Sequence, residues 1–162
     1  MWQILFLVIV VLFFMFSFVL LFGAPYLPTL TKQVDAAVEL AGLSPGDTIL
    51  ELGCGDGRVL LRAAKHGLNA VGYEINPILF LVAYLRTRRY AKQIGVIYGN
   101  FWNKHWPAAD AVYVFLLPRL MPKLEFKVKQ ESLVKPRVIS FAFQFPGIKP
   151  KSVKDGVFLY EL

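Results

Sequence analysis

The sequence of 162 residues predicts an α/β fold, in which a mostly parallel sheet has helices on both faces and is preceded by one N-terminal transmembrane helix. Three observations lead to this prediction. Apolar strand-like segments alternate with helix-like segments along most of the chain, and a glycine-rich loop follows the first of these strands. A run of nineteen residues, from 4 to 22, is apolar except for Ser17. Such alternation favours parallel strands joined by right-handed crossovers.

The apolar run is long enough to cross a bilayer. As a helix it would measure roughly 29 Å, close to the ~30 Å thickness of the hydrocarbon core. A cleaved signal peptide would begin with a basic segment and carry a shorter apolar stretch, but residues 1–3 contain no Lys or Arg, and every charged residue follows residue 22. We therefore expect an anchor over residues 1–23 and one domain over residues 24–162, since the remaining length suits a single core.

The chain is basic, with a net charge of +7 at pH 7 and a pI of about 9.6. Nine Lys and Arg lie between Arg119 and the last residue, against four acidic residues. Such an excess suits an anionic partner. Because the domain would be tethered beside a bilayer, anionic lipid headgroups are favoured over nucleic acid. The single cysteine, Cys54, excludes an internal disulfide and a cysteine-based zinc cluster.

The first half of the domain contains two predicted helices and two predicted strands. Thr31 can cap a first helix and Gly42 can end it. A turn at residues 44–47 precedes an apolar segment, and Gly67 can end the helix that follows that segment. The expected elements are a helix over about 31–41, a strand over 48–52, a helix ending at His66 and a strand over 69–74.

The second half continues the same alternation. Asn76 can cap a helix, and Pro77 suits its first position. The expected elements are a helix over 77–93, strands over 96–98 and 111–116, a helix over 122–132, and strands over 138–143 and 157–160. Ligands of parallel sheets bind at the carboxyl ends of the strands. We therefore expect the functional residues in the loops that follow the strands.

The loop after the first strand carries three glycines at alternate positions, Gly53, Gly55 and Gly57, behind the acidic Glu51. Glycines allow a sharp turn and let a ligand approach the backbone closely. The next helix directs its N-terminal amides toward the same place. A dinucleotide-binding pattern would need a glycine where Arg58 stands. The spacing therefore favours a ligand that has no pyrophosphate.

Polar and aromatic residues follow the next two strands. Glu74 ends the second strand, where a carboxylate can accept both hydroxyls of a ribose. A surface glutamate that happens to end a strand is the alternative, and the preceding glycine loop disfavours it. Asn100 and Phe101 follow the third strand, where an amide and a ring suit the edge and face of an adenine, although aromatic residues there are more often part of the core.

These loops resemble the motifs of the class I S-adenosylmethionine-dependent methyltransferases, which have a Rossmann-like sheet. The whole domain resembles a narrower group: the small archaeal protein-lysine methyltransferases and the membrane-anchored mitochondrial ones that act on the ATP synthase c subunit and the adenine nucleotide translocase. The resemblance covers about residues 25–162. The segments that carry it are residues 25–29, 52–58, 71–77, 115–125 and 137–140.

The resemblance implies S-adenosylmethionine as the cofactor and a role for each loop residue. Glu51 and the three glycines would lie near the methionine portion, Glu74 would bind the ribose, and Ile75 would pack on the adenine. Asn100 and Phe101 would hold the adenine edge and face. Many relatives carry Asp at the position of Asn100, so we expect a weaker contact there. Because the cofactor is made in the cytoplasm, we expect a single-pass membrane protein whose catalytic domain faces the cytoplasm.

The resemblance also implies that the methyl acceptor is a lysine of a protein in or at the membrane. The fourth strand lacks the Asn/Asp-Pro-Pro-Tyr/Phe tetrapeptide of amino-adenine and glutamine methyltransferases, which disfavours DNA. The substrate-side candidates are Tyr26, Phe115, Phe143 and Gln144, because an apolar funnel would lower the pKa of an entering lysine. Packing in the core is an equal alternative for these aromatic residues. No general base is predicted.

Two other functions stay open. Methylation of a lipid-like small molecule, such as a quinone or a phospholipid, suits the anchor equally well. A non-catalytic cofactor-binding scaffold at the membrane is the other alternative, and the intact glycine loop and Glu74 argue against it.

The remaining polar residues are expected to be structural. His66 stands at a helix C-terminus, where the helix dipole explains it, and His105 has no second ligand at metal spacing, so no metal site is expected. Cys54 is expected to fill space in the glycine loop. Arg86 and the pair at positions 88–89 are expected on a solvated or headgroup-facing side of their helix.

Overall fold

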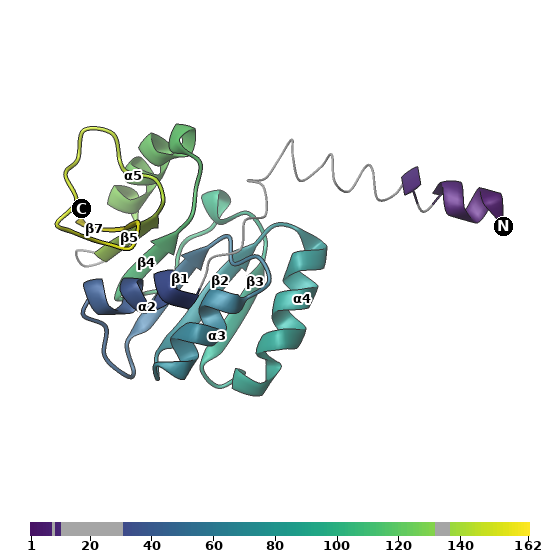
Figure 1. Cartoon of the computed structure of the whole chain (residues 1–162), viewed down its shortest axis with the longest axis horizontal. Helices are drawn as coiled ribbons and strands as arrows, with labels where there is room; N and C mark the ends of the chain where they lie inside the picture. The colour runs from purple at the N-terminus through teal and green to yellow at the C-terminus, as the bar shows by residue number, and fades with distance from the viewer. Residues whose placement is uncertain (8, 11–30, 132–136) are drawn as a thin grey trace.

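The computed structural model describes residues 1–7, 9–10, 31–131 and 137–162. The strands in these ranges are β1 (Thr48–Leu52), β2 (Asn69–Glu74), β3 (Ile94–Tyr98), β4 (Ala111–Val114), β5 (Arg137–Phe141), β6 (Ser152–Lys154) and β7 (Val157–Glu161). They form one sheet in the order β3-β2-β1-β4-β5-β7-β6. The strands β1 to β5 are parallel to one another, and β7 is antiparallel to β5 and β6. The predicted mostly parallel α/β sheet is confirmed (Figure 1).

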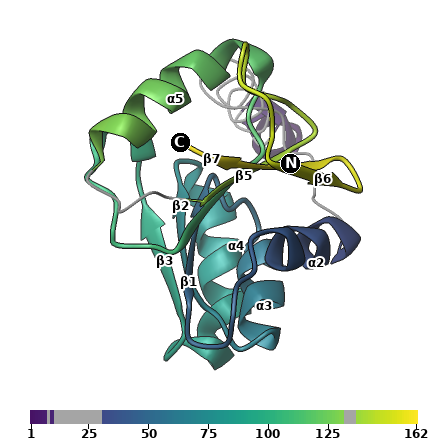
Figure 2. The ribbon, with the colours of Figure 1, turned by 90° about the vertical axis from the view of Figure 1, so that its left-hand side faces the viewer.

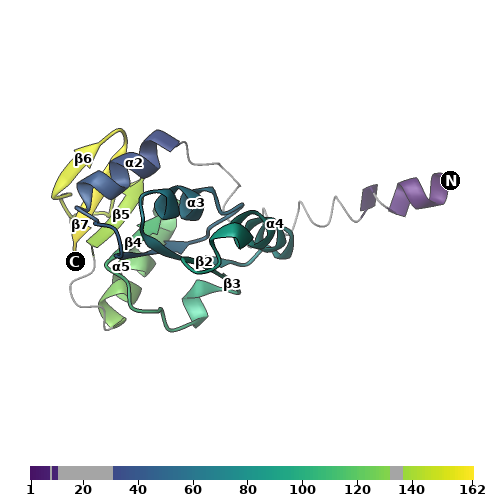
Figure 3. The same cartoon turned by 90° about the horizontal axis from the view of Figure 1, so that it is seen from below.

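Helices cover both faces of the sheet, as predicted. The helices are α2 (Thr31–Leu40), α3 (Arg58–Lys65), α4 (Pro77–Thr87) and α5 (Met121–Gln130), with 3₁₀ turns η1 (Arg88–Tyr90), η2 (Phe101–Asn103) and η3 (Pro118–Leu120). Figures 2 and 3 show α2, α3 and α4 on one face and α5 on the other. The cap predicted for α4 is present, because the Asn76 side chain accepts hydrogen bonds from the backbone N–H groups of Ile78 and Leu79.

The two faces of the sheet belong to two buried clusters, because successive strand residues point to opposite faces. Ile49 packs in the cluster under α2, α3 and α4, whereas Leu50 and Leu52 pack in the cluster under α5. Parallel strands covered on both faces read as nearly continuous apolar runs. This is why the central strands could be recognised in the sequence.

The first helix of the domain is held by the last strands. Val34 of α2 belongs to the same buried cluster as Val157 and Leu159 of β7. An ion pair of 2.7 Å joins Lys32 to Asp155, in the turn between β6 and β7. The sheet edge formed by β6 and β7 therefore depends on residues from the other end of the domain.

Several predicted element boundaries are wrong. β3 begins at Ile94 instead of residue 96, and α5 ends at Gln130 instead of residue 132. α4 ends at Thr87 instead of residue 93, because the chain tightens into the 3₁₀ turn η1. β4 ends at Val114 instead of residue 116, because η3 begins soon after it. β5 ends at Phe141 instead of residue 143, because Ala142 adopts a left-handed φ of 65°. The three-residue strand β6 was not predicted.

Most of the predicted membrane anchor lies outside the described residues. Residues 2–7 are helical and exposed, and residue 8 and the segment 11–30 are not described. Within the described ranges, no helix has both the length and the apolarity needed to cross a membrane. The predicted domain boundary at residues 23–24 lies outside the described residues as well.

Candidate functional site

The glycine loop lies over the carboxyl ends of β1 and β2. The backbone N–H groups of Gly53 and Cys54 both donate to the Tyr73 carbonyl oxygen, at 3.0 and 2.8 Å. Gly53 has a φ of 95°, which L side chains rarely adopt, and a Cβ at this residue would meet nothing within 4 Å. The space over the loop is therefore open at Gly53.

Gly72, in β2, lets the glycine loop pack closely on the sheet. A Cβ at Gly72 would lie 2.6 Å from the Cys54 Cβ and 2.9 Å from its Sγ. Cys54 itself is 3% exposed, and burial raises the pKa of its thiol. Cys54 therefore fills the space between loop and strand, as predicted.

Glu74 joins three loops at this edge of the sheet. Its Oε2 accepts a hydrogen bond of 2.8 Å from the backbone N–H of Gly55, and its Oε1 accepts one of 2.8 Å from Asn76. Its backbone oxygen accepts a hydrogen bond of 2.9 Å from Gly99, which begins the loop after β3. Burial raises the pKa of Glu74, and the N–H groups of Asn76, Gly55 and Ile75 lower it only in part.

Glu51 is a buried carboxyl with an incomplete set of partners. The residue is 5% exposed, and its Oε2 has no hydrogen-bond partner among the described residues. Burial raises the pKa of Glu51 well above its ordinary value, and the nearby carboxylates of Glu74 and Asp56 raise it further. A cationic hydrogen-bond donor bound beside Glu51 would relieve both effects.

The residues predicted for the adenine follow β3. The Asn100 Oδ1 accepts a hydrogen bond of 3.0 Å from the Trp102 backbone and so caps η2. The ring of Phe101 packs against Trp102, with centroids 4.6 Å apart. Ile75, which directly follows Glu74, is half-buried. The structure thus brings Ile75, Asn100 and Phe101 to the strand ends where Glu74 lies.

Two of the four substrate-side candidates lie together at the ends of β4 and β5. The Phe115 ring lies 6.1 Å from Phe143 and 4.8 Å from Phe141, measured between centroids. Phe141 was missed because its position in a strand suggested core packing. Gln144 is exposed, and no contact places it with the three rings. Tyr26 lies outside the described residues.

Arg86 is exposed, as expected, with 44% of its side chain accessible, but it also contacts the glycine loop. Its guanidinium donates to the carboxylate of Asp56. Arg58 donates to the same carboxylate through Nε, at 3.0 Å, and through Nη2, at 2.9 Å. Asp56 is 6% exposed. The two arginines therefore compensate a buried charge in the glycine loop and connect the loop to α4.

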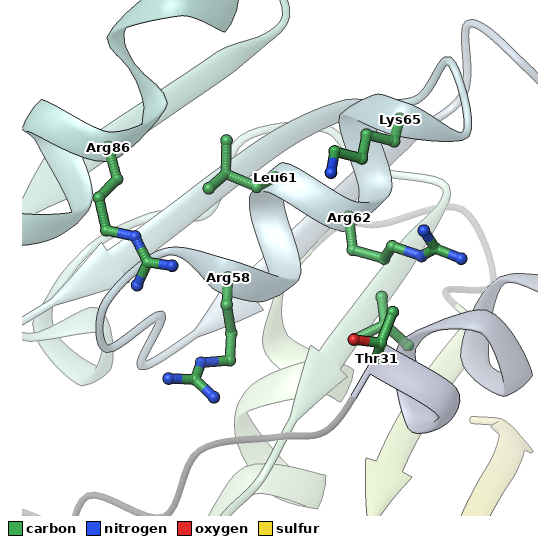
Figure 4. A pocket seen from close by; sticks show the side chains of 7 residues that line it. Thr31, Arg58, Leu61, Arg62, Lys65 and Arg86 are labelled. Atoms are coloured by element: carbon green, nitrogen blue, oxygen red, sulfur yellow. The ribbon is translucent and has the colours of Figure 1, made fainter.

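These arginines line a cavity of about 380 Å³ on the outer side of α3. Figure 4 shows Arg58 and Arg86 extending into the same space from α3 and α4. The lining residues are Thr31, Val34, Arg58, Leu61, Arg62, Lys65 and Arg86. The cavity was not predicted, although the spacing of Arg58, Arg62 and Lys65 places them on one helix face.

Both histidines have structural surroundings. The His66 Nε2 lies 2.8 Å from the Asp35 Oδ1, and Arg62 donates to the same carboxylate. Hydrogen bonds from Arg62 and His66 lower the pKa of Asp35 to about 2. His105 is exposed, 3.8 Å from Glu131. His66 also ends α3, as predicted.

The basic C-terminal part carries less free charge than the sequence suggested. Five of its nine cations form ion pairs with carboxylates. These pairs are Lys127–Glu131, Lys129–Glu125, Arg137–Asp47, Lys151–Glu161 and Lys154–Glu39. The expected positive surface is therefore partly neutralised.

The chain is similar to proteins of one enzyme class. The family model described as the ANTKMT methyltransferase domain matches residues 51–152. A Xenopus laevis lysine N-methyltransferase of the ATP synthase c subunit is 34% identical over 146 residues, covering 85% of this chain and 63% of that protein. A protein-lysine N-methyltransferase of Saccharolobus islandicus is 35% identical over 148 residues, covering 84% of this chain and 92% of that protein.

The fold has a counterpart among solved structures. The crystal structure of an RNA methyltransferase from Salinibacter ruber, in complex with S-adenosyl-L-homocysteine, superposes with a TM-score of 0.75. It is 28% identical and covers 83% of this chain and 91% of that one. This chain spans about three fifths of the length of the first vertebrate relatives that it matches.

Proposed function

This chain belongs to the ANTKMT methyltransferase domain family, and from this membership we propose that it is an S-adenosylmethionine-dependent methyltransferase that methylates lysine side chains of proteins. One observation carries the proposal: the glycine loop is joined by the Glu74 carboxylate to the loop that follows β2. This places an acidic acceptor and an open glycine backbone at the carboxyl ends of the strands, where ligands of such sheets bind. The names of the relatives from Xenopus laevis and Saccharolobus islandicus support lysine as the acceptor.

The residues present fit this cofactor. Its methionine portion bears an ammonium and a sulfonium, and the buried Glu51 has an oxygen without a partner among the described residues. The open space at Gly53 leaves room over the loop. A carboxylate offers about four lone-pair sites, and two hydrogen bonds reach the Glu74 oxygens, so Glu74 keeps acceptor capacity for ribose hydroxyls. When bound, S-adenosylmethionine supplies an activated methyl group.

Each predicted residue then has a role in holding the cofactor. Glu51 and the glycines at positions 53, 55 and 57 hold the methionine portion, and Glu74 holds the ribose. Ile75 and Phe101 pack on the adenine, and Asn100 meets its edge. Because the Asn100 Oδ1 already caps η2, we expect its contact with the adenine to be weak.

The aromatic cluster of Phe115, Phe141 and Phe143 provides a path for the acceptor. Aromatic faces attract an ammonium, and loss of water around it lowers the pKa of the lysine, so that the neutral amine becomes accessible. Methyl transfer then depends mainly on alignment and on exclusion of water. The chain's own residues thus guide, desolvate and orient the amine.

We further propose that residues 4–22 form a single membrane-spanning helix and that the catalytic domain faces the cytoplasm. The length and apolarity of the run support the helix, and the supply of the cofactor in the cytoplasm supports the orientation. The acceptor lysine would then belong to a protein in or at the same membrane. Anionic lipid headgroups would be a second partner of the basic domain.

The test supplies labelled S-adenosylmethionine to membranes and to a lipid extract, with the full-length chain, its Glu74→Ala variant and a Glu39→Ala control. Glu39 is an exposed residue of α2, so this control keeps the site intact. Label should enter proteins at lysine with the native chain and the control, and fall at least about tenfold with Glu74→Ala, since each hydrogen bond to a charged group contributes roughly 1.5–3 kcal/mol.

Each other result identifies a different function. Label found only in the chloroform phase would identify a lipid-like acceptor, such as a quinone or a phospholipid. Cofactor binding by calorimetry, with no label transferred to protein or lipid, would identify a non-catalytic scaffold. Thermal unfolding of the same sample shows whether Glu74→Ala loses cofactor binding alone or loses binding because it no longer folds.

A further inference from the structure

Helix α4 is apolar on the side that faces away from the sheet. Ile78, Leu81, Val82 and Leu85 are spaced at i, i+3, i+4 and i+7, which puts them on one helix face. Their exposed fractions are 45%, 54%, 37% and 49%. On the opposite side, Ala83 is buried in the core. We call the first four residues the outer face of α4.

The outer face of α4 has no cover among the described residues. The helix lies at the flank of the domain, beside the edge strand β3 (Figures 1 and 3). A helix that is apolar all round is normally buried on all sides. Contiguous apolar surface of this kind marks a site of interaction with a protein or a membrane.

The rim is cationic at one end and aromatic along one side. Arg88, Arg89 and Lys92 follow the helix and are exposed, and none of them forms an ion pair with another described residue. Tyr84 and Tyr98 are 56% and 54% exposed. Apolar residues on one face, arginines beside them and tyrosines at the border are typical of helices that lie in the membrane interface. An anionic bilayer complements all three features.

We propose that the outer face of α4 lies in the interfacial region of an anionic bilayer, with Arg88 and Arg89 against lipid phosphates. The α4 contact rests on the membrane attachment proposed above and specifies which surface of the domain meets the bilayer. It does not depend on methyl transfer. It also replaces the basic C-terminal part as the main lipid contact, because five of the nine cations of that part are paired with carboxylates.

Docking through α4 would set the orientation of the site. Asn76 caps α4, and the side chain of Glu74 accepts the Asn76 N–H. The cofactor residues therefore stand at the N-terminal end of the docked helix. A lysine at the end of a membrane helix would approach the domain from the side, near the bilayer surface.

The test places a fluorescent probe on single introduced cysteines of the full-length chain. Leu85→Cys reports the outer face of α4, and Phe126→Cys is the matched control, since Phe126 is a 65% exposed apolar residue on the opposite face of the sheet. Native Cys54 is buried, so the native chain incubated with the probe sets the background. The labelled chains are reconstituted in phosphatidylcholine–phosphatidylglycerol vesicles with and without brominated acyl chains.

The probe at position 85 should lose about half or more of its emission to brominated lipid, because an interfacial helix buries its apolar face roughly 5–10 Å into the boundary between headgroups and acyl chains. The probe at position 126 should be nearly unaffected. Changing Arg88→Glu and Arg89→Glu together should reduce the quenching at position 85. Thermal unfolding of each labelled chain verifies that it is folded.

Equal quenching at the two positions would overturn the proposal. It would also be overturned by a probe at position 85 that is shielded from water but not quenched by bromine, because a second copy or another segment of the chain would then cover the face. Flotation with the vesicles tests the membrane anchor, and calorimetry with S-adenosylhomocysteine tests the cofactor site. A chain that floats and binds S-adenosylhomocysteine but shows no quenching at position 85 would therefore refute the α4 contact alone.

Discussion

Replacing Gly72 by alanine tests whether the sheet holds the glycine loop in place. The added Cβ would lie 2.6 Å from the Cys54 Cβ, 2.8 Å from the Leu60 Cδ1 and 2.9 Å from the Cys54 Sγ. The Leu60 methyl is the end of a flexible side chain and can rotate away. The Cys54 Cβ is attached directly to the loop backbone, so the loop itself must move.

The expected cost follows from these distances. Ordinary contact between carbon atoms is roughly 3.5–4.0 Å, so the loop at Cys54 must retreat by about 1 Å. Overpacking of this size destabilises a protein by about 1–3 kcal/mol. For a chain of this length, each kcal/mol lowers Tm by roughly 2–4 °C. We therefore expect Tm to fall by roughly 2–12 °C on these two scales.

The assay compares Gly72→Ala with Gly95→Ala by thermal unfolding and by methyl transfer. Gly95 lies in the neighbouring strand β3, and a Cβ there would meet nothing within 4 Å. Its substitution should leave stability unchanged or raise it by ~0.4–1 kcal/mol, because alanine restricts the unfolded chain. Methyl transfer should slow by roughly 10–100-fold in Gly72→Ala alone, since a misplacement of ~1 Å can cost about 100-fold.

Equal unfolding temperatures for the two variants would refute this reasoning. A further check removes the opposing atoms. In the Gly72→Ala background, Cys54→Gly deletes the Cβ and Sγ that clash, so the two substitutions should be coupled favourably by about 0.5–3 kcal/mol in a double-mutant cycle. Additive effects would show that the strain lies elsewhere.

Three further predictions concern the carboxylates and the aromatic cluster. Burial raises the pKa of Glu51 above its ordinary 4.5, so the folded chain keeps a proton that the unfolded chain loses, and stability falls as pH rises from 4.5 toward the raised pKa. Glu51→Gln removes this titration and should flatten the fall in Tm that the native chain shows above pH 4.5. Arg86→Ala leaves the Asp56 carboxylate with fewer hydrogen-bond donors, so it should lower the free energy of unfolding in urea by about 1–3 kcal/mol. The control Arg88→Ala should change that free energy by less than about 0.5 kcal/mol. Phe115→Leu should raise KM for a lysine-rich protein roughly 2–10-fold, with unchanged calorimetric affinity for S-adenosylhomocysteine.

The core of the fold was predictable because burial dictates its residue types. The strands β1, β2 and β4 are covered on both faces, so they read as short apolar runs, and the cap at Asn76 marks the start of α4. β6 was not predictable, because its three residues are half-exposed or exposed and leave no pattern. The exposed outer face of α4 also resembles core residues, so periodicity could not reveal which side faces the sheet.

The site was predictable only as far as local sequence determines it. Glycines at alternate positions and an acidic residue at the end of a strand indicate a ligand loop by their spacing alone. The hydrogen bond from Gly55 to Glu74 and the pairing of Arg86 with Asp56 depend on how β2 and α4 pack beside the glycine loop. Local sequence spacing does not predict these two contacts, because they join residues that are 19 and 30 positions apart in the chain.

The packing of α2 against the last strands has a consequence for synthesis on the ribosome. Val34 meets its partners Val157 and Leu159 only after about 120 further residues have been made, which takes roughly 6–25 s at the usual rate of translation. During that interval the apolar side of α2 has no partner in β7. Nascent chains are therefore expected to bind chaperones through α2 until β7 has emerged from the ribosome and can pack against it.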